Sequence, residues 1–255
     1  TRIASLIEVG ARPNAIAVLY RTNFQSRVLE EALLFAGIPY QVLGVRFYER
    51  KEVKDVISYL KASRNPTSIF DLERIINVPA RGVGKVTLQK IFAGEISALP
   101  PTMRAKVTKF YELLDRIRKA GETMKPSQLI AFIIKETGIE HMLSDGDDED
   151  TERLANVREL VSVATRYDVF DSSSAETGGS ETGIEQFLSD VALESDQDTM
   201  KGEVDAVRLM TIHASKGLEF PYVFITGMEQ DLFPSRRSQE ESNSVSEREE
   251  ERRLF

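Results

Sequence analysis

Short apolar runs and longer helical repeats divide the sequence into three blocks. In the first block, β-branched apolar runs at 15–21 and 38–44 predict two strands, and the stretch 22–37 between them predicts a helix. A strand, a helix and a second strand in close succession are typical of a parallel βαβ unit. We therefore expect an α/β fold in this block.

The helix between these strands has recognisable start and stop signals. Thr22 or Asn23 can cap its first turn, and Gly37 suits the position after its last turn. Its apolar residues recur at helical spacing, which predicts an apolar face: Val28, Leu29, Ala32, Leu33 and Phe35.

From about residue 52 to 200 the pattern is helical throughout. Apolar residues recur at three- and four-residue spacing, Pro126 stands near one helix start, and Gly121 and Gly138 stand at helix ends. The acidic run 144–150 lacks the regular spacing of an EF-hand loop, so it predicts a solvated loop or a helix N-terminus. No stretch of this block predicts a strand, and we expect an all-helical domain.

Strand patterns return after residue 203. Apolar runs at 207–212 and 222–228 predict two strands, with the polar insert HASKGLE between them. The Ser- and Gly-rich segment 171–183 predicts a loop, and the tail 238–255 is dense in charge. The order α/β, all-α, α/β is most simply explained by a helical domain inserted into a split α/β domain.

Composition narrows the class of protein. The chain has 255 residues, of which 41% are hydrophobic and 29% charged, with a mean hydropathy of −0.26. This is typical of a soluble protein with one large or two medium domains. No apolar run approaches the roughly 18 residues of a membrane-spanning helix, and the first residues lack a signal-peptide layout. We therefore expect a cytoplasmic protein without a membrane partner.

Charge and residue usage exclude several kinds of site. The absence of cysteine removes disulfides, thiol catalysis and thiolate metal ligands, and the two histidines, His141 and His213, lie far apart. We therefore expect no metal site. The net charge of −8 excludes a wholly basic coat for nucleic acid. It leaves room for local basic patches, in which a few Arg and Lys side chains bind phosphate.

The glycine-rich stretch 81–91 suggests contact with phosphate. Its GVGKVT resembles the end of a Walker A loop, but Pro79 stands where that loop needs glycine, and Val86 replaces the magnesium-binding Ser or Thr. A Gly-x-Gly hairpin leading into a helix explains the stretch better, because Gly82 and Gly84 would let phosphate approach backbone N–H groups. Helix-hairpin-helix elements bind a nucleic-acid backbone in this way. An ordinary tight turn remains the alternative.

Two further stretches combine polar and cationic side chains. Arg21, Thr22 and Asn23 directly follow a predicted strand, at the edge where open α/β sheets bind ligands, and could hold phosphate oxygens. A helix cap with a surface arginine is the alternative. Arg46 precedes two aromatic residues, a pattern that can follow a nucleic-acid strand and that is also found at ordinary domain junctions.

The stretch TIHASKGLEF is more specific. Glu219 is an acceptor, as recognition of sugar hydroxyls requires. A Ser-His-acid triad fits poorly, because nothing here resembles a nucleophile elbow. Four other side chains could bind a phosphate or a neighbouring loop: Thr211, His213, Ser215 and Lys216. Five polar groups between two strands favour a binding role over a generic polar turn.

Together these segments resemble the C-terminal half of superfamily 1 DNA helicases of the UvrD/PcrA/Rep type. The resemblance lies, in the family's order, in IAVLYRTNFQSRVLEEALLFAGIPYQVLG, VRFYERKEVKDVISYLK, INVPARGVGKVTL, RLMTIHASKGLEFPYVFITGMEQDLFPSRRS and EEERRLF. It implies an α/β RecA-like motor lobe, 2A, with a partial parallel sheet, split by an inserted all-α domain, 2B. We expect 2A over 1–52 and 203–255, incomplete at its C-terminus, and 2B over 53–202.

The resemblance also implies roles for single residues. In this family ATP binds between lobes 1A and 2A, and Glu219 would hold its ribose. Thr211 and His213 would lie near DNA and help couple ATP binding and hydrolysis to the strength of DNA binding. The residues implied in nucleic-acid binding are Arg21, Asn23 and Arg46 on single-stranded DNA, Thr211 and His213 near it, and the 2B hairpin Gly82, Val83 and Gly84 on duplex DNA.

For the whole protein, the resemblance implies an ATP-dependent DNA helicase that uses ATP and Mg²⁺. It would move 3′ to 5′ on single-stranded DNA and unwind a single-strand/duplex junction in bacterial DNA repair or replication. Its partners would be the N-terminal lobes 1A and 1B and other repair proteins. This chain contains neither a Walker A nor a Walker B motif, so we expect the chain alone to bind no cofactor and to be inactive. It also departs from the family in having one glycine, Gly44, before Arg46, and Ser235 where some relatives carry His.

Two alternatives stay open. The chain could be a non-catalytic DNA- or protein-binding module derived from a helicase half, which binds through the glycine hairpin. It could also belong to a nuclease subunit related to the same helicases, which would need a nuclease domain beyond Phe255. Walker motifs upstream and residues like the family's TRA segment downstream would favour the motor.

Overall fold

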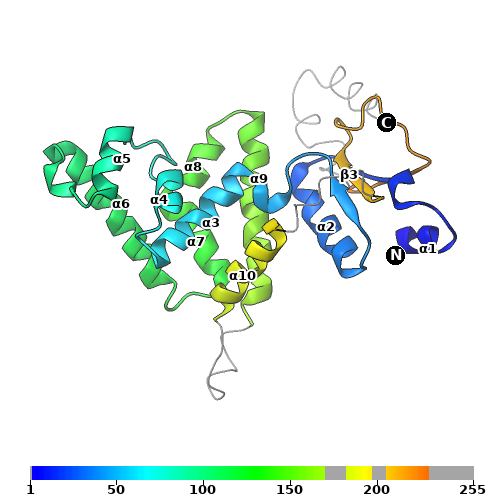
Figure 1. Cartoon of the computed structure of the whole chain (residues 1–255), viewed down its shortest axis with the longest axis horizontal. Helices are drawn as coiled ribbons and strands as arrows, with labels where there is room; N and C mark the ends of the chain where they lie inside the picture. Colours follow the sequence, from blue (N-terminus) through cyan, green and yellow to red (C-terminus); the bar gives the residue numbers. More distant parts are fainter. Residues whose placement is uncertain (1, 170–181, 197–204, 230–255) are drawn as a thin grey trace, which may run out of the picture. The chain divides into compact units, whose positions relative to one another are not determined.

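The computed structural model describes residues 2–169, 182–196 and 205–229, which fall into two compact units (Figure 1). The sheet unit comprises residues 1–47 and 197–255, and the helical unit comprises residues 48–196. These boundaries fall a few residues before those expected from the sequence. The charged tail 238–255 and most of the predicted loop 171–183 lie outside the described residues.

The sheet unit is built on four parallel strands in the order β2-β3-β1-β4. Their bounds are β1 Ile16–Tyr20, β2 Tyr40–Val42, β3 Val207–Thr211 and β4 Tyr222–Ile225. In β1, Val18 is aligned with Leu209 of β3 on one side and with Phe224 of β4 on the other. The predicted parallel α/β fold is confirmed. However, β1 and β2 do not pair with each other, because β3 lies between them.

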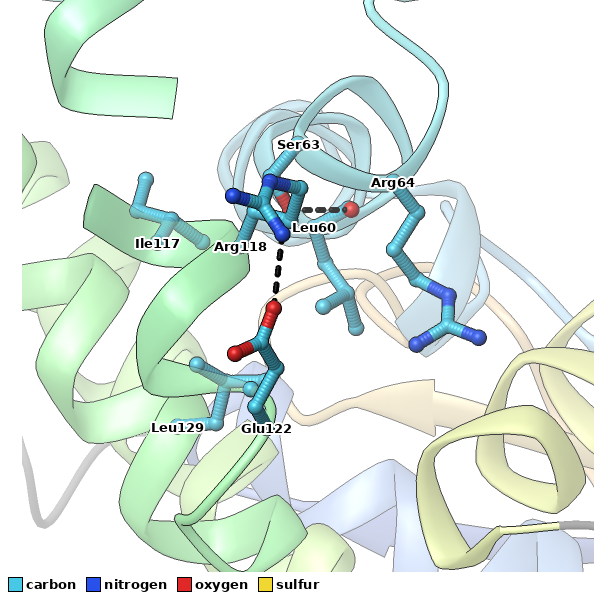
Figure 2. A pocket seen from close by; sticks show the side chains of 8 residues that line it. Leu60, Ser63, Arg64, Ile117, Arg118, Glu122 and Leu129 are labelled. Carbon is cyan, nitrogen blue, oxygen red and sulfur yellow. Dashed lines mark hydrogen bonds and ion pairs between the residues drawn. The ribbon is translucent and has the colours of Figure 1, made fainter. Parts of the chain in front are cut away.

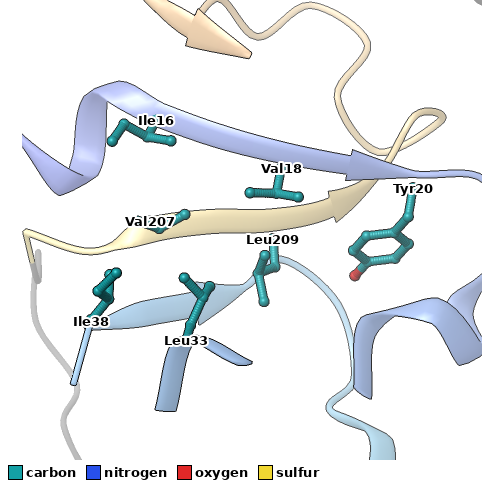
Figure 3. Close-up of a cluster of buried hydrophobic side chains, with 7 residues drawn as sticks. All are labelled: Ile16, Val18, Tyr20, Leu33, Ile38, Val207 and Leu209. Carbon is teal, nitrogen blue, oxygen red and sulfur yellow. The ribbon is translucent and has the colours of Figure 1, made fainter. Parts of the chain in front are cut away.

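Alternate residues of β1 face opposite sides of the sheet. Ile16, Val18 and Tyr20 belong to a buried cluster that includes Leu33 of α2 (Ser26–Phe35) and is covered further by α1 (Arg2–Glu8) (Figure 3). A second cluster on the other face consists of Ala17, Leu19, Met210 and Ile212. Each fully buried aliphatic side chain contributes roughly 1.5–3 kcal/mol, so these clusters hold the strands in register.

The predicted apolar face of α2 is only partly buried. Leu33 is 5% exposed and Leu29 packs against the core, but Val28 is 54% exposed, Phe35 is 97% exposed, and Ala32 is also exposed. At 100° per residue, residues 29 and 33 share the sheet side, whereas 28, 32 and 35 point the opposite way. Val28, Ala32 and Phe35 therefore lie on the exposed side of α2. Ser26, Arg27 and Glu30 are buried in their place.

The helical unit contains no strand among its described residues. Its helices are α3 Lys51–Arg64, α4 Ile69–Ile75, α5 Lys85–Phe92, α6 Pro101–Ala120, α7 Pro126–Thr137, α8 Ile139–Ser144, α9 Asp148–Ala164 and α10 Gly183–Asp196. The central helix is α3, which packs against α4, α6, α7 and α9 and is buried along most of its length. Across the described parts of the chain, no helix combines the length and the apolar composition that crossing a bilayer requires.

Several helix ends confirm the signals read from the sequence. Pro126 is the first residue of α7, and Gly138 follows that helix in the left-handed conformation with φ of 82°. Gly121 follows the last residue of α6. In the acidic run, Asp147 caps α9 by accepting a hydrogen bond from the backbone N–H of Asp150 at 3.1 Å. Residues 145–147 of that run therefore connect α8 to α9, and residues 148–150 begin α9.

Candidate functional site

Polar side chains gather where β1 and β3 end. Tyr20, the last residue of β1, is aligned with Thr211, the last residue of β3. Because the strands are parallel, the chain leaves both at the same edge of the sheet. Arg21 and Asn23 are half-buried there, and His213 is exposed. The structure thus brings four of the predicted nucleic-acid residues to one edge.

Gln25 holds the loop that follows β1. Its Oε1 accepts hydrogen bonds from the backbone N–H of Arg21 at 3.1 Å and of Thr22 at 3.0 Å, and from the Thr22 hydroxyl at 3.1 Å. These bonds complete a capping box on the short 3₁₀ turn Asn23–Gln25, in which Thr22 is the N-cap. Thr22, one of the two expected cap residues, thus caps this 3₁₀ turn, whereas the N-cap residue of α2 is Gln25. Gln25 was missed, although the Thr-x-x-Gln spacing could have identified it.

The loop after β4 packs against the same glutamine. Gly227 has φ of 70°, and a Cβ at this position would lie 1.9 Å from Gln25 Nε2. The preceding Thr226 donates from its backbone N–H and its hydroxyl to the Leu19 carbonyl, at 2.9 and 3.2 Å. Glycine is therefore needed both for the backbone conformation and for the close approach of Gln25.

The hydroxyls of the TIHASKGLEF stretch shape its turn. The Thr211 hydroxyl accepts from the backbone N–H of Ala214 at 3.1 Å, and the Ser215 hydroxyl donates to the Ile212 carbonyl at 2.8 Å. Such local bonds stabilise a turn directly after a strand. The side chain of Lys216 is exposed on this turn.

Glu219 lies on the path back across the sheet. β4 begins at Tyr222, which is aligned with Ile16 at the start of β1, so the chain returns from the carboxyl edge to the amino edge. Ile16 and Tyr20 are four residues apart, which places the two edges about 13 Å apart along the strand. Phe220 packs on the cluster around Leu19, and Glu219 beside it is exposed. Glu219 thus lies on the connection that leads from the edge carrying Arg21 to the opposite edge.

Arg46 also lies away from that edge. Its guanidinium carbon is 5.6 Å from the centroid of the Tyr40 ring, at the first residue of β2. Tyr40 is aligned with Val207, four residues before the end of β3. The cation–π contact holds the arginine along the outer strand of the sheet. The structure therefore does not bring Arg46 together with Arg21.

The helical unit carries the glycine hairpin. Gly82 adopts φ of 70°, Gly84 is the N-cap residue of α5, and both are exposed, whereas Val83 between them is 5% exposed. The predicted Gly-x-Gly turn into a helix is present. Exposed glycines at a helix start leave the backbone N–H groups accessible to an anion.

The hairpin stands in the most basic part of the chain. Lys106 of α6 donates from Nζ to the Arg81 carbonyl at 3.1 Å, and this Nζ would lie 3.6 Å from a Cβ on Gly82. Between residues 81 and 109, Glu95 is opposed by six cations: Arg81, Lys85, Lys90, Arg104, Lys106 and Lys109. The segment thus carries +5, which leaves −13 for the rest of the chain. Lys106 was missed because it is distant from the hairpin in sequence.

A pocket of about 290 Å³ lies elsewhere in the helical unit, between α3, α6 and the start of α7 (Figure 2). Its two arginines already have carboxylate partners. Arg118 contacts Asp115 at 2.8 Å and Glu122 at 2.6 Å, and Arg64 contacts Glu185 at 2.8 Å. Their charge is therefore compensated within the protein, and we assign no ligand to this pocket.

Two comparisons with known proteins bear on these sites. The family described as UvrD-like helicase C-terminal domain matches residues 1–99 and 97–255. Two similar relatives are named ATP-dependent DNA helicase PcrA, from Staphylococcus epidermidis and Staphylococcus aureus. Each is 38% identical over 262 residues, which cover 96% of this chain and 35% of the relative. The chain thus spans about a third of the length of these curated relatives.

Proposed function

Because the chain belongs to the UvrD-like helicase C-terminal domain family, we propose that it forms the 2A and 2B domains of an ATP-dependent DNA helicase. In this proposal the sheet unit is 2A and the helical unit is 2B. The whole protein couples ATP hydrolysis to 3′-to-5′ movement on single-stranded DNA, and to duplex unwinding in DNA repair or replication. The N-terminal lobes 1A and 1B provide the Walker motifs, so this chain alone is inactive.

The carboxyl edge of the sheet is the single-strand contact in this proposal. The observation that carries it is the alignment of Tyr20 with Thr211, which gathers Arg21, Asn23 and His213 at one edge. Arg and Asn side chains on a held backbone can bind phosphate oxygens without reading sequence. Gln25 fixes that backbone, so the affinity for single-stranded DNA depends on the loop conformation as much as on Arg21.

Glu219 is the nucleotide contact. An exposed carboxylate can accept hydrogen bonds from both hydroxyls of a ribose. Glu219 lies on the connection from β3 to β4, whereas Arg21 and Asn23 lie on the loop after β1, so each can act on its own ligand. The turn from Thr211 to Lys216 links them, and its movement on ATP binding would change the grip on DNA.

The metal belongs to the other half of the protein. Among the described residues, no three His, Asp or Glu side chains are grouped as metal ligands. We therefore assign no residue of this chain to Mg²⁺, which is held by the N-terminal lobes together with the ATP phosphates. The role of domain 2A is to close on the nucleotide and to hold the single strand of DNA.

Two substitutions in the full-length protein test the sheet unit. Glu219→Ala should raise KM for ATP about tenfold or more, because hydrogen bonds to a charged group are lost, and leave affinity for single-stranded DNA unchanged.

Arg21→Ala should weaken the affinity for single-stranded DNA. It should also lower the slope of log affinity against log salt concentration by about 0.7, the value for one phosphate contact. Arg12→Ala is the matched control, because Arg12 is exposed at the amino end of β1. Unchanged ATP use and DNA affinity in both test variants would contradict the assignment.

A substitution in the hairpin tests the duplex contact. Gly84 has φ of −81°, and a Cβ there would meet nothing within 4 Å, so Gly84→Val can be accommodated. It should nevertheless weaken duplex binding, because the side chain blocks a phosphate from the backbone N–H groups. A titration of duplex DNA over a range of salt concentrations measures this effect. Equal binding by the variant and the natural protein would exclude the hairpin as the contact.

A second candidate function is a non-catalytic DNA-binding module. The hairpin and its cations, which lie entirely within the helical unit, favour it, because they could bind duplex without a motor. Single-strand-stimulated ATP hydrolysis by the full-length protein distinguishes the two. Duplex binding without any such hydrolysis would support the module.

A further inference from the structure

The conformation of the glycine hairpin depends on a side chain outside it. Asn77 follows α4 and its C-cap residue Ile76, six residues before Val83. Its Nδ2 donates to the Val83 carbonyl at 2.6 Å, and its Oδ1 accepts from the Val83 backbone N–H at 2.9 Å. One amide side chain thus satisfies both backbone groups of the central hairpin residue, as a neighbouring strand would.

The chain is anchored again just before the first glycine. NH1 of Arg81 contacts four backbone carbonyls, those of Ile75, Ile76, Val78 and Pro79, at 3.1 to 3.2 Å. Its guanidinium also lies over the rings of Tyr59 and Phe110, with centroid distances of 5.9 and 5.4 Å. Arg81 is therefore committed to the protein interior. The exposed glycines sit between this anchor and α5.

We propose that Asn77 is a positioning residue for duplex binding, which holds the backbone of the Gly82–Gly84 hairpin in the form that accepts a phosphate. This inference rests on the proposed function. A hairpin already held in its bound conformation loses less conformational freedom when it binds. Lys106 adds a positive charge at the same place, whereas Asn77 bonds to both backbone groups of Val83.

The two hydrogen bonds between Asn77 and Val83 lead to a specific prediction for two variants of the full-length protein. Asn77→Ala removes both bonds to Val83 and should weaken duplex affinity about tenfold. Asn77→Asp at pH 7.5 keeps the acceptor for the Val83 N–H but loses the donor to its carbonyl, so duplex affinity should also fall.

A second readout separates positioning from general stability. Single-strand-stimulated ATP hydrolysis should be unchanged in both Asn77 variants, because the hairpin belongs to the duplex contact. A general loss of folded protein would lower both activities. The matched control is Asn65→Ala, which removes an exposed Asn side chain that accepts hydrogen bonds from Thr67, at 2.7 and 3.3 Å. It should bind duplex as the natural protein does.

The outcomes distinguish this inference from the proposed function. Weak duplex binding by Gly84→Val together with normal binding by Asn77→Ala overturns the role of Asn77 and keeps the hairpin as the contact. If Asn77→Ala does not fold, normal duplex binding by Asn77→Asp at pH 7.5 overturns that role. If Gly84→Val binds duplex normally, the proposed contact fails and the role of Asn77 fails with it.

Discussion

Gly227 shows how a single residue supports the carboxyl edge of the sheet. Alanine at this position would adopt φ of 70° with its Cβ 1.9 Å from Gln25 Nε2, so Gln25 would have to leave the loop that it holds. We expect Gly227→Ala to lower the free energy of unfolding by about 1–3 kcal/mol and to weaken single-strand affinity. Urea unfolding and a DNA titration measure the two effects.

Gly37 offers a matched control for this substitution. It has a similar φ of 65°, but a Cβ there would meet nothing within 4 Å. Gly37→Ala should therefore report the backbone strain alone, at about 1 kcal/mol, and leave DNA affinity intact. If the two variants lose the same stability and both bind DNA normally, the contact with Gln25 has no role.

In the helical unit, the core also depends on a single residue, Asn156. It is 4% exposed, accepts from Arg50 NH1 at 2.9 Å and donates to Glu52 Oε1 at 2.6 Å. Removal of a buried partner of charged groups is costly, so Asn156→Ala should lower the free energy of unfolding by about 1–3 kcal/mol. Chemical denaturation tests this, and a loss below about 0.5 kcal/mol, the range of an ordinary surface substitution, would contradict it.

At the scale of elements, α3 is held to the hairpin region through Tyr59. Its hydroxyl donates to the Ile75 carbonyl at 3.2 Å and also to the Val78 carbonyl. Burial, opposed by Arg81, raises the pKa of Tyr59 to about 12. The folded state therefore keeps this proton up to a higher pH than the unfolded chain, in which tyrosine titrates near pH 10. The stability contributed by Tyr59 is fully present below pH 10 and is lost as the pH rises towards 12.

This titration makes Tyr59→Phe a pH-dependent variant. At pH 8 the variant should be less stable than the natural protein by about 1–2 kcal/mol, since two carbonyls lose their donor. The difference should shrink above pH 10, because phenylalanine has no proton to lose. Urea unfolding of both proteins at pH 8 and pH 11 measures it. A difference that stays constant would show that the Tyr59 proton is not linked to folding.

Elements were predictable where their signals are local. The start of α7 at Pro126 and its end at Gly138 depend on a few neighbouring residues, and both are confirmed. Strand order was not predictable in this way. β3 comes from more than 160 residues after β2, yet it lies between β1 and β2.

The residues of the candidate site differ in the same way: the positions of some follow from local signals, and the positions of others do not. Arg21 and Thr211 directly follow or end strands, so their shared edge follows from parallel pairing alone. Glu219 and Arg46 lie on connecting segments outside the strands. Only the fold determines where these segments place the two residues relative to the strand ends. Asn77 and Lys106 reach the hairpin through tertiary contacts for which the sequence has no marker.

At the scale of the whole molecule, the two units differ in how their chain segments are joined. The helical unit is one continuous segment, 48–196, with its own buried core around α3. The sheet unit is made from two segments. β1 comes from the first, and both of its neighbours, β3 and β4, come from the second.

We therefore expect the two units to behave differently in isolation. Residues 48–196 produced alone should be helical and unfold in one cooperative transition, because the core of this unit is formed within the segment. Residues 1–47 alone should be unfolded, because β1 then has no partner for its backbone N–H and C=O groups. Circular dichroism with urea unfolding tests both segments. A 48–196 segment without a cooperative transition would mean that the helical core requires the sheet unit, and duplex binding would then have to be measured only in the intact protein.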